Sequence, residues 1–352
     1  MKKHLFYLAA AVVAMSSCTE SEVIEISQSK AIGFDSYVGN TTRAEQEGQT
    51  LDVLKEEGNG FYVFGAYKEG ENDPTIVFDG HNSSSHVTWR EDEKGNGKSW
   101  GYSPVNFWLE RGIYKFGAYA PKLNITPTFD YATNEMTFSK FEATDGKTDL
   151  LVAAANKDGI SGAAPTMVSF AFKHALSKVR FTIIDGWRND VELVISDVKL
   201  VSVKSTGTLV TPATLKEGTL VHAENWTVET ATTDYKDAGA TLTQLNATYL
   251  FDNFVIPQTI NDALALEFTV VVNNPNGTSI KLDAEGNTTK NITVPVSTES
   301  VTKWLPGNAY NYKLTISGNT FGLNPIQFEA TEVKDWNEND ITDGKTPIVT
   351  KP

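Results

Sequence analysis

Apolar residues in this chain come in short runs that alternate with polar residues, and no long stretch shows the spacing of an amphipathic helix. In residues 264–272 and 310–316 every second residue, counted from the first, is a large apolar one. A period of two places such residues on one face of a β-strand. Runs of this kind between clusters of Gly, Asn, Asp and Pro predict an all-β chain built as a sandwich or barrel.

The first half of the chain has the same texture in shorter pieces. The expected strands are residues 31–38, 61–67, 75–78, 87–90, 114–119, 136–141 and 150–154. Residues 51–57 predict one or two helical turns. Within residues 191–203 the apolar parity changes at Ser196-Asp197, which predicts a bulge or bend in a strand.

The N-terminal residues have the pattern of an export signal. The basic residues 2–4 precede an apolar run over 5–15, and two serines lead into Cys18, the only cysteine. The run is shorter than the roughly 18 residues that cross a bilayer. Because the ending resembles a bacterial lipobox, we expect a signal peptide over 1–17, a lipid on Cys18 and an acidic tether over 18–30. The alternative is an ordinary secretory signal with a chance cysteine.

Composition narrows the classes of function. The chain has 352 residues, enough for two domains, and a formal net charge of −14. This charge repels phosphate backbones and anionic head groups, so we expect no nucleic-acid partner. Attachment to the outer membrane would therefore depend on the lipid of Cys18. The absence of thiols beyond Cys18 excludes disulfides and thiolate metal sites from the rest of the chain.

Two segments imitate ligand sites. Gly97-Lys98-Ser99 resembles the end of a phosphate-binding loop, but Asp92 stands where that loop requires glycine. His81, His86 and Asp79 could hold a metal, yet their spacing fixes no geometry and a polar surface loop explains them equally well. We expect no metal and no cofactor.

An aromatic-rich region has two interpretations. Its members are Trp89, Trp100, Tyr102, Phe107 and Trp108. Such residues fill a sandwich core more often than they form an exposed platform for sugars. No pair of carboxylates and no nucleophile motif stands out, so we expect no enzyme. His174, in an apolar setting, is expected to be a packed and hydrogen-bonded residue.

Several segments together resemble the fimbrillin family, whose members build the protease-assembled type V pili of Bacteroides-type bacteria. In order along the chain, these segments are residues 61–67, 100–108, 114–121, 149–153, 172–179 and 304–312. Their order, joined to the lipobox and the acid-rich residues 19–25, carries the resemblance, which spans nearly the whole chain.

The resemblance implies an all-β fold of two tandem transthyretin-like β-sandwich domains. We place the N-terminal domain at residues 31–172, with a first strand at 31–38 and a cleavable loop at 39–50. The C-terminal domain then covers residues 173–352.

The resemblance also implies an assembly mechanism. Family precursors reach the cell surface as lipoproteins, where a trypsin-like or Arg-specific protease cuts after an arginine behind the first strand. Arg43-Ala44 matches that place, although an exposed loop can contain an arginine by chance. Loss of Ile32, Phe34 and Val38 with the first strand would open a groove that a strand from the next subunit fills.

The donor strand has two candidates. Ile326, Phe328 and Ala330 share one parity and Val333 follows, and the C-terminal segment 326–352 ends in a polar tail. Residues 326–336 serve as the donor or close the second sandwich, and the tail is the other candidate donor. The expected function is a structural subunit of a cell-surface fimbrium that serves adhesion, with other fimbrial subunits as partners. The alternatives are a surface glycan-binding lipoprotein and, third, an extracytoplasmic hydrolase.

Overall fold

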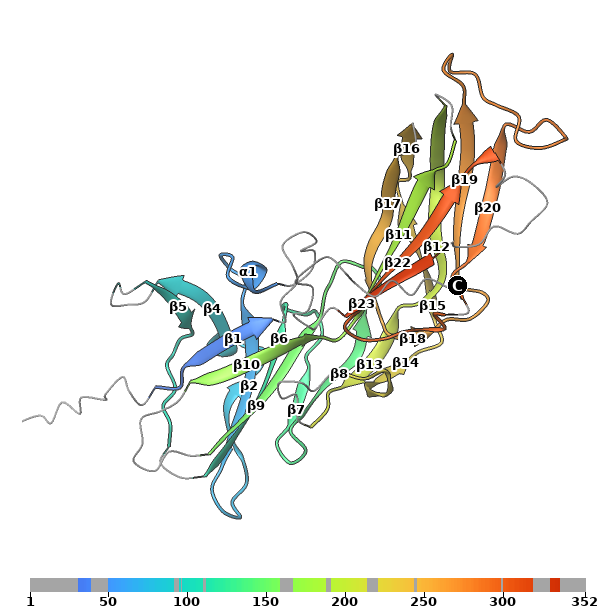
Figure 1. Ribbon diagram of the computed structural model, residues 1–352. Helices are drawn as coiled ribbons and strands as arrows, with labels where there is room; N and C mark the ends of the chain where they lie inside the picture. Colours follow the sequence, from blue (N-terminus) through green and yellow to red (C-terminus); the bar gives the residue numbers. More distant parts are fainter. Residues whose placement is uncertain are drawn as a thin grey trace, which may run out of the picture.

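A computed structural model describes residues 31–38, 50–91, 95, 97–109, 112–158, 167–187, 191–213, 221–243, 246–298, 300–318 and 330–335. Regular structure in these residues is almost entirely β-strand, as Figure 1 shows. The exceptions are the short helix α1 (Leu51–Leu54) and two 3-10 turns, Ser83–Ser85 and Ala223–Asn225. The prediction of an all-β chain is therefore confirmed.

The first half of the chain forms an eight-stranded sheet. Its order is β1-β10-β9-β6-β2-β4-β5, and β3 also pairs with β2. The strands are β1 (Phe34–Val38), β2 (Phe61–Lys68), β3 (Thr75–Asp79), β4 (His86–Glu91), β5 (Lys98–Gly101), β6 (Ile113–Ala120), β9 (Leu151–Asp158) and β10 (Val168–His174).

A second sheet, in the order β14-β13-β8-β7, combines residues from both halves of the chain. It consists of β7 (Thr128–Asp130), β8 (Glu135–Glu142), β13 (Thr206–Val210) and β14 (Trp226–Val228).

Three further sheets belong to the second half. The first has the order β17-β11-β22-β23, and the second has the order β15-β12-β19-β20 with β16 also paired to β12. The third is the pair β18-β21. The strands are β11 (Ser177–Asp185), β12 (Glu192–Lys204), β15 (Thr232–Asp237), β16 (Ala240–Thr243), β17 (Ala247–Val255), β18 (Gln258–Thr259), β19 (Ala265–Asn273), β20 (Thr289–Pro295), β21 (Lys303–Trp304), β22 (Asn308–Ile316) and β23 (Ala330–Asp335).

The central strands of the first half are buried on both faces. On β2, Phe61 and Val63 pack with the side chains of β1 and β10, and we call this cluster the β1 core. Tyr62 and Phe64 point to the opposite face and pack with β8, in a cluster that we call the β8 core. The alternating side chains of one strand thus serve two cores, which is why residues 61–67 are all buried.

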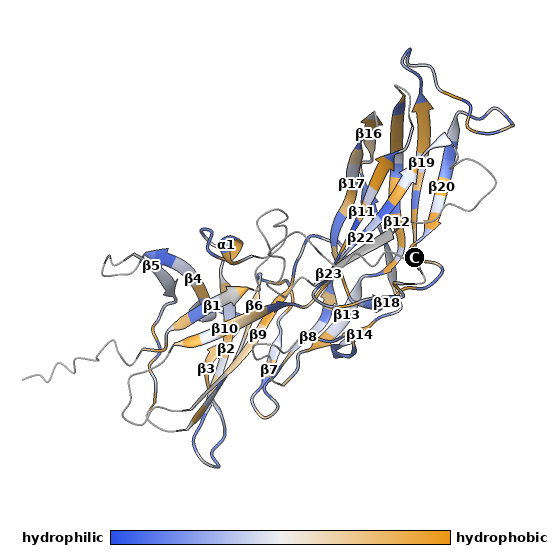
Figure 2. Ribbon diagram, in the orientation of Figure 1, coloured by the Kyte–Doolittle hydropathy of each residue, from blue (hydrophilic) through white to orange (hydrophobic). Residues whose placement is uncertain are grey.

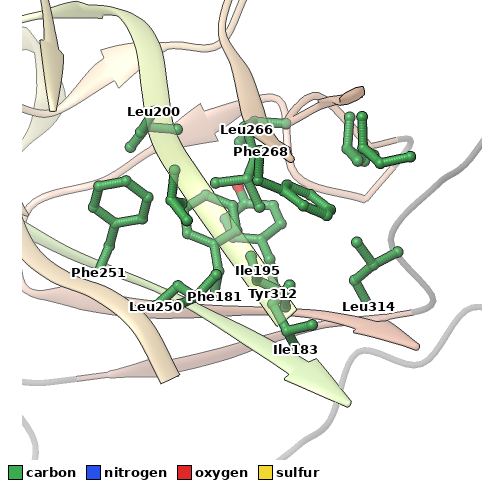
Figure 3. Close-up of a cluster of buried hydrophobic side chains, with 14 of the residues drawn as sticks. Phe181, Ile183, Ile195, Leu200, Leu250, Phe251, Leu266, Phe268, Tyr312 and Leu314 are labelled. Atoms are coloured by element: carbon green, nitrogen blue, oxygen red, sulfur yellow. The ribbon is translucent and has the colours of Figure 1, made fainter. Parts of the chain in front are cut away.

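The second half has its own core, drawn in Figure 3. Phe181 stacks on Tyr312 with ring centroids 5.2 Å apart, and the buried Trp304 donates its indole N–H to the Tyr312 hydroxyl at 2.9 Å. Strand β20, at the end of its sheet, alternates in burial: Ile292 and Val294 are buried, whereas Asn291 and Thr293 are exposed. Figure 2 shows the matching alternation between hydrophobic and hydrophilic colour along this strand.

The predicted irregularity at Ser196-Asp197 is confirmed. The register of β12 against β19 shifts between Ser196 and Lys199. Asp197 has a φ of 53°, in the left-handed region that non-glycine residues seldom adopt. This bulge lets the strand change which parity faces the core.

The two halves are joined by backbone pairing as well as by the chain itself. Strand β13 pairs with β8 across the proposed boundary, with Leu209 opposite Phe138. Strand β14, which pairs with β13, extends the same sheet, with Trp226 opposite Leu209. The division at residues 172 and 173 stays a prediction, and β13 and β14 show that the second half supplies strands to a sheet of the first.

Candidate functional site

Strand β1 lies at the end of its sheet and has one strand partner. It runs parallel to β10, with Phe34 opposite Val168 and Val38 opposite Phe172. Among the described residues no strand pairs with its other edge. Near its N-terminal end, Ala31 bridges Phe107 and the Ile32 N–H donates to the Asn106 carbonyl at 2.9 Å.

The side chains of β1 nevertheless reach the middle of the β1 core. Ile32, Phe34, Ser36 and Val38 share one parity and are buried, whereas Asp35 is exposed. The Phe34 ring is fully buried and lies among five aromatic rings, those of Phe61, Phe78, Tyr102, Phe116 and Phe170, at centroid distances of 5.4–6.4 Å. We call the position that residues 32–38 fill against these rings the β1 slot.

Tyr102 holds the N-terminal end of the segment that fills the β1 slot. Its hydroxyl donates to the Ile32 carbonyl at 2.9 Å and accepts the Asn106 N–H at 3.1 Å. Burial raises the pKa of Tyr102 to about 12, against a smaller lowering by the bond from Asn106. The hydroxyl therefore keeps its proton, and with it the ability to donate to β1, over the physiological pH range.

The first strand of the second half is held differently. Strand β11 runs parallel to β22, as β1 runs parallel to β10, but it also pairs antiparallel with β17 along nearly its whole length. Each half thus pairs an early strand with a late one in parallel. Of these two strands, β11 has two strand neighbours and β1 has one among the described residues.

The chain beyond β1 has its own anchor. Thr50 caps α1 by accepting the Val53 N–H, and Leu54 of that helix is fully buried. The Lys55 ammonium lies 4.5 Å from the centre of the Trp89 ring. The chain from residue 50 onward is thus held by a helix cap, a buried leucine in the β1 core and a contact with Trp89, besides its covalent connection to β1.

Comparison with known proteins identifies the family of the chain. A family model described as fimbrillin-like matches residues 42–336. The chain belongs to the fimbrillin-like family.

Solved structures give a wider set of similar chains. A proposed cell adhesion protein from Bacteroides uniformis is 20% identical over 87% of this chain and 99% of its own, with a TM-score of 0.48. One from Bacteroides ovatus is 16% identical over 87% and 98%, also with a TM-score of 0.48. The fimbrial anchor protein Mfa2 from Porphyromonas gingivalis is 10% identical over 87% and 97%, with a TM-score of 0.31. A search of the curated proteins finds no match.

The structure of this fimbrillin-like protein brings together three of the predicted site residues. Ile32, Phe34 and Val38 all lie in the β1 core. Ser36, between them, was not singled out from the sequence, although it shares their parity and that parity could have found it.

The remaining predicted site residues have other placements. Cys18, Arg43, Ala44, Ile326 and Phe328 lie outside the described residues. Ala330 and Val333 belong to β23, which pairs antiparallel with β22 in the chain's own sheet.

The histidine loop is organised by a carboxylate. Asp79 accepts hydrogen bonds from the His81 and Asn82 N–H groups and the Ser85 hydroxyl. Burial raises the pKa of Asp79, but these bonds together outweigh it and lower the pKa to about 2. His86 stacks on Tyr62 at 4.5 Å. In the described part of the chain, no three His, Cys, Asp or Glu residues gather as a metal site would require.

The aromatic region is mainly core. Trp100, Tyr102 and Trp108 are buried in the β1 core, and Phe107 is 39% exposed. This favours the packing interpretation over a platform for sugars. His174 is packed as predicted, since its Nδ1 lies 3.1 Å from the buried Asp149 carboxylate. None of the described helices has the length and apolar character needed to span a bilayer.

Proposed function

We propose that this fimbrillin-like protein is a structural subunit of a cell-surface fimbrium, assembled by replacement of β1 with a strand from a neighbouring subunit. The observation that carries the proposal is that β1 has one strand partner and yet supplies the central side chain of its core. A strand with one strand partner, whose removal leaves an apolar slot, suits β-augmentation, in which backbone bonds and alternate pockets bind a new strand.

The energetics agree with a lasting joint. Ile32, Phe34 and Val38 are nearly fully buried. At about 1.5–3 kcal/mol for each such side chain, removal of β1 forfeits about 4.5–9 kcal/mol of apolar burial. An incoming strand with similar side chains would recover this energy without any disulfide, in agreement with a chain that has no thiol beyond Cys18.

Proteolysis after Arg43 would separate the two anchored parts of the chain. In the sequence, Arg43-Ala44 lies between β1 and Thr50, the cap of α1. An Arg-specific protease acting there would free β1 while the anchored chain from residue 50 stays in place. Cys18 lies on the same side of the cut as β1, so the lipid would hold the precursor at the outer membrane until cleavage.

The donor is a C-terminal segment of another subunit. Residues 326–336 remain a candidate, and so does the tail that follows β23. Use of Ala330 and Val333 as donors would require β23 to leave β22, with which it pairs in this structure.

A reversible crosslink across β1 and β10 tests the proposal. Asp35 and Ser169 are opposite each other and both exposed, so the D35C/S169C variant, prepared from residue 19 onward, would contain no other thiol. After trypsin cleavage we expect ladders of oligomers under reducing conditions and monomers only when the disulfide is closed. The two single variants are controls that should form ladders in both conditions.

Two outcomes contradict the proposal. Ladders that form equally with the disulfide closed would show that β1 need not leave. An Arg43→Ala variant that trypsin converts to the same ladders would remove the role of that residue.

A further inference from the structure

Ser36 is a polar residue in an apolar position of β1. It lies between Phe34 and Val38 on the inward parity, opposite the buried Phe170 of β10. Ser36 is 6% exposed, and its hydroxyl has no hydrogen-bond partner among the described residues. The nearby Asp35 carboxylate accepts the Ser36 backbone N–H at 2.8 Å and lies on the exposed side of the strand.

A buried hydroxyl without a partner lowers the stability of the state that buries it. It has lost its hydrogen bonds to water and gained none in return, a loss equivalent to about a five- to 150-fold change in an equilibrium constant. The unfavourable contribution applies only while β1 is seated, because a released β1 returns the hydroxyl to water. Ser36 thus weakens the seated strand without weakening the slot.

We propose that Ser36 lowers the affinity of β1 for its own slot, and that the slot binds more tightly a strand with a small apolar side chain at that position. This inference rests on the proposed function, because it specifies which strand the slot selects. A replacing strand would keep the contacts of Ile32 and Phe34 and relieve the unpaired hydroxyl, which gives exchange a favourable direction.

The chain contains a segment with this chemistry. Residues 326–330 read Ile-Gln-Phe-Glu-Ala, and residues 32–36 read Ile-Gly-Phe-Asp-Ser. Isoleucine, phenylalanine and an acidic residue recur at the same spacing, and alanine stands where Ser36 does. We therefore assign residues 326–330 of a second copy as the occupant, with Ala330 in the position of Ser36.

The first measurement concerns the uncut protein. Ser36→Ala should raise the folding equilibrium constant of the first half about tenfold, which corresponds to about 1.4 kcal/mol in urea titrations. Ser36→Thr, which keeps a hydroxyl, should give no such gain. Ser169→Ala is the matched control, since Ser169 is exposed on the adjacent strand. A Ser36→Ala variant no more stable than this control would overturn the inference.

The second measurement concerns exchange. Trypsin-cleaved protein, with β1 still seated, is mixed with fluorescent peptides of residues 31–42, of the same residues carrying Ser36→Ala, and of residues 325–335. We expect the second peptide to displace β1 about tenfold more effectively than the first, and the third, which carries Glu332 in the position of Val38, to displace β1 less effectively than the second. Equal displacement by the first two peptides would overturn this inference while leaving strand exchange intact. No displacement by any peptide would overturn the proposed function itself.

Discussion

Replacement of Phe34 by alanine should be among the most damaging single changes to the first half of the protein. The ring is fully buried and lies within 6.4 Å of five other aromatic rings. Phe→Ala changes in cores cost about 3–5 kcal/mol through lost burial and the cavity that remains. Because the five rings come from β2, β3, β6, β10 and the segment after β5, they cannot close together without moving several strands. We therefore expect a loss near 5 kcal/mol.

Urea titration followed by tryptophan fluorescence measures this loss, because Trp100 and Trp108 lie in the same core. The matched control is Phe107→Ala, which truncates a ring that is 39% exposed and should change stability by less than about 0.5 kcal/mol. If Phe34→Ala lowered the free energy of unfolding by less than about 1 kcal/mol, close to the effect of a surface change, the central position of β1 would be refuted. Equal losses in the two variants would refute it too.

Three other predictions concern the rest of the fold. Trp226→Phe should cost about 1–3 kcal/mol in urea titrations, because the buried Ala175 carbonyl loses its indole donor; no loss would show that this bond does not stabilise the link between β10 and β11. Gly80→Ala should reduce thermal stability strongly, since Gly80 has a φ of 81° and an added Cβ would meet the Phe64 ring, whereas Gly70→Ala, with no atom near its added Cβ, should cost less. The raised pKa of Tyr102 stabilises the folded protein fully below pH 10 and progressively less as pH rises from 10 to about 12. Tyrosinate absorbance should therefore rise together with unfolding, and ionisation of Tyr102 in a still-folded protein would contradict this.

The period-two pattern predicted local structure well. The expected strands at residues 61–67, 114–119 and 136–141 correspond to β2, β6 and β8. The parity change at Ser196-Asp197 predicted the bulge, because a strand must bend there to keep its apolar residues inside.

Long-range pairing was harder to predict. The parallel pairing of β1 with β10 joins residues more than a hundred positions apart, and a period-two pattern contains no information about partners. The pairing of β13 with β8 likewise crosses the expected boundary. Burial of β2 on both faces also removes the alternation that would show which residues face which core.

The candidate site was partly predictable. The apolar parity of Ile32, Phe34 and Val38 was visible in the sequence, and the structure places all three in one core. Ser36 could not be distinguished from a solvent-facing serine, because only its surroundings show that its hydroxyl is buried and unpaired. The sequence also contained nothing that distinguished β1, with one strand neighbour, from β11, with two.

The short connection between β10 and β11 has a mechanical consequence. Only Ala175 and Leu176 separate these strands; both are buried, and each is hydrogen-bonded to a neighbouring segment. A force that pulls on the strand in the β1 slot would therefore pass through β10 directly to β11 and the second half of the chain. The two buried linking residues offer no flexible linker that could extend first. A filament of such units would resist extension until strands slide past one another in shear, and would yield by rupture instead of gradual lengthening.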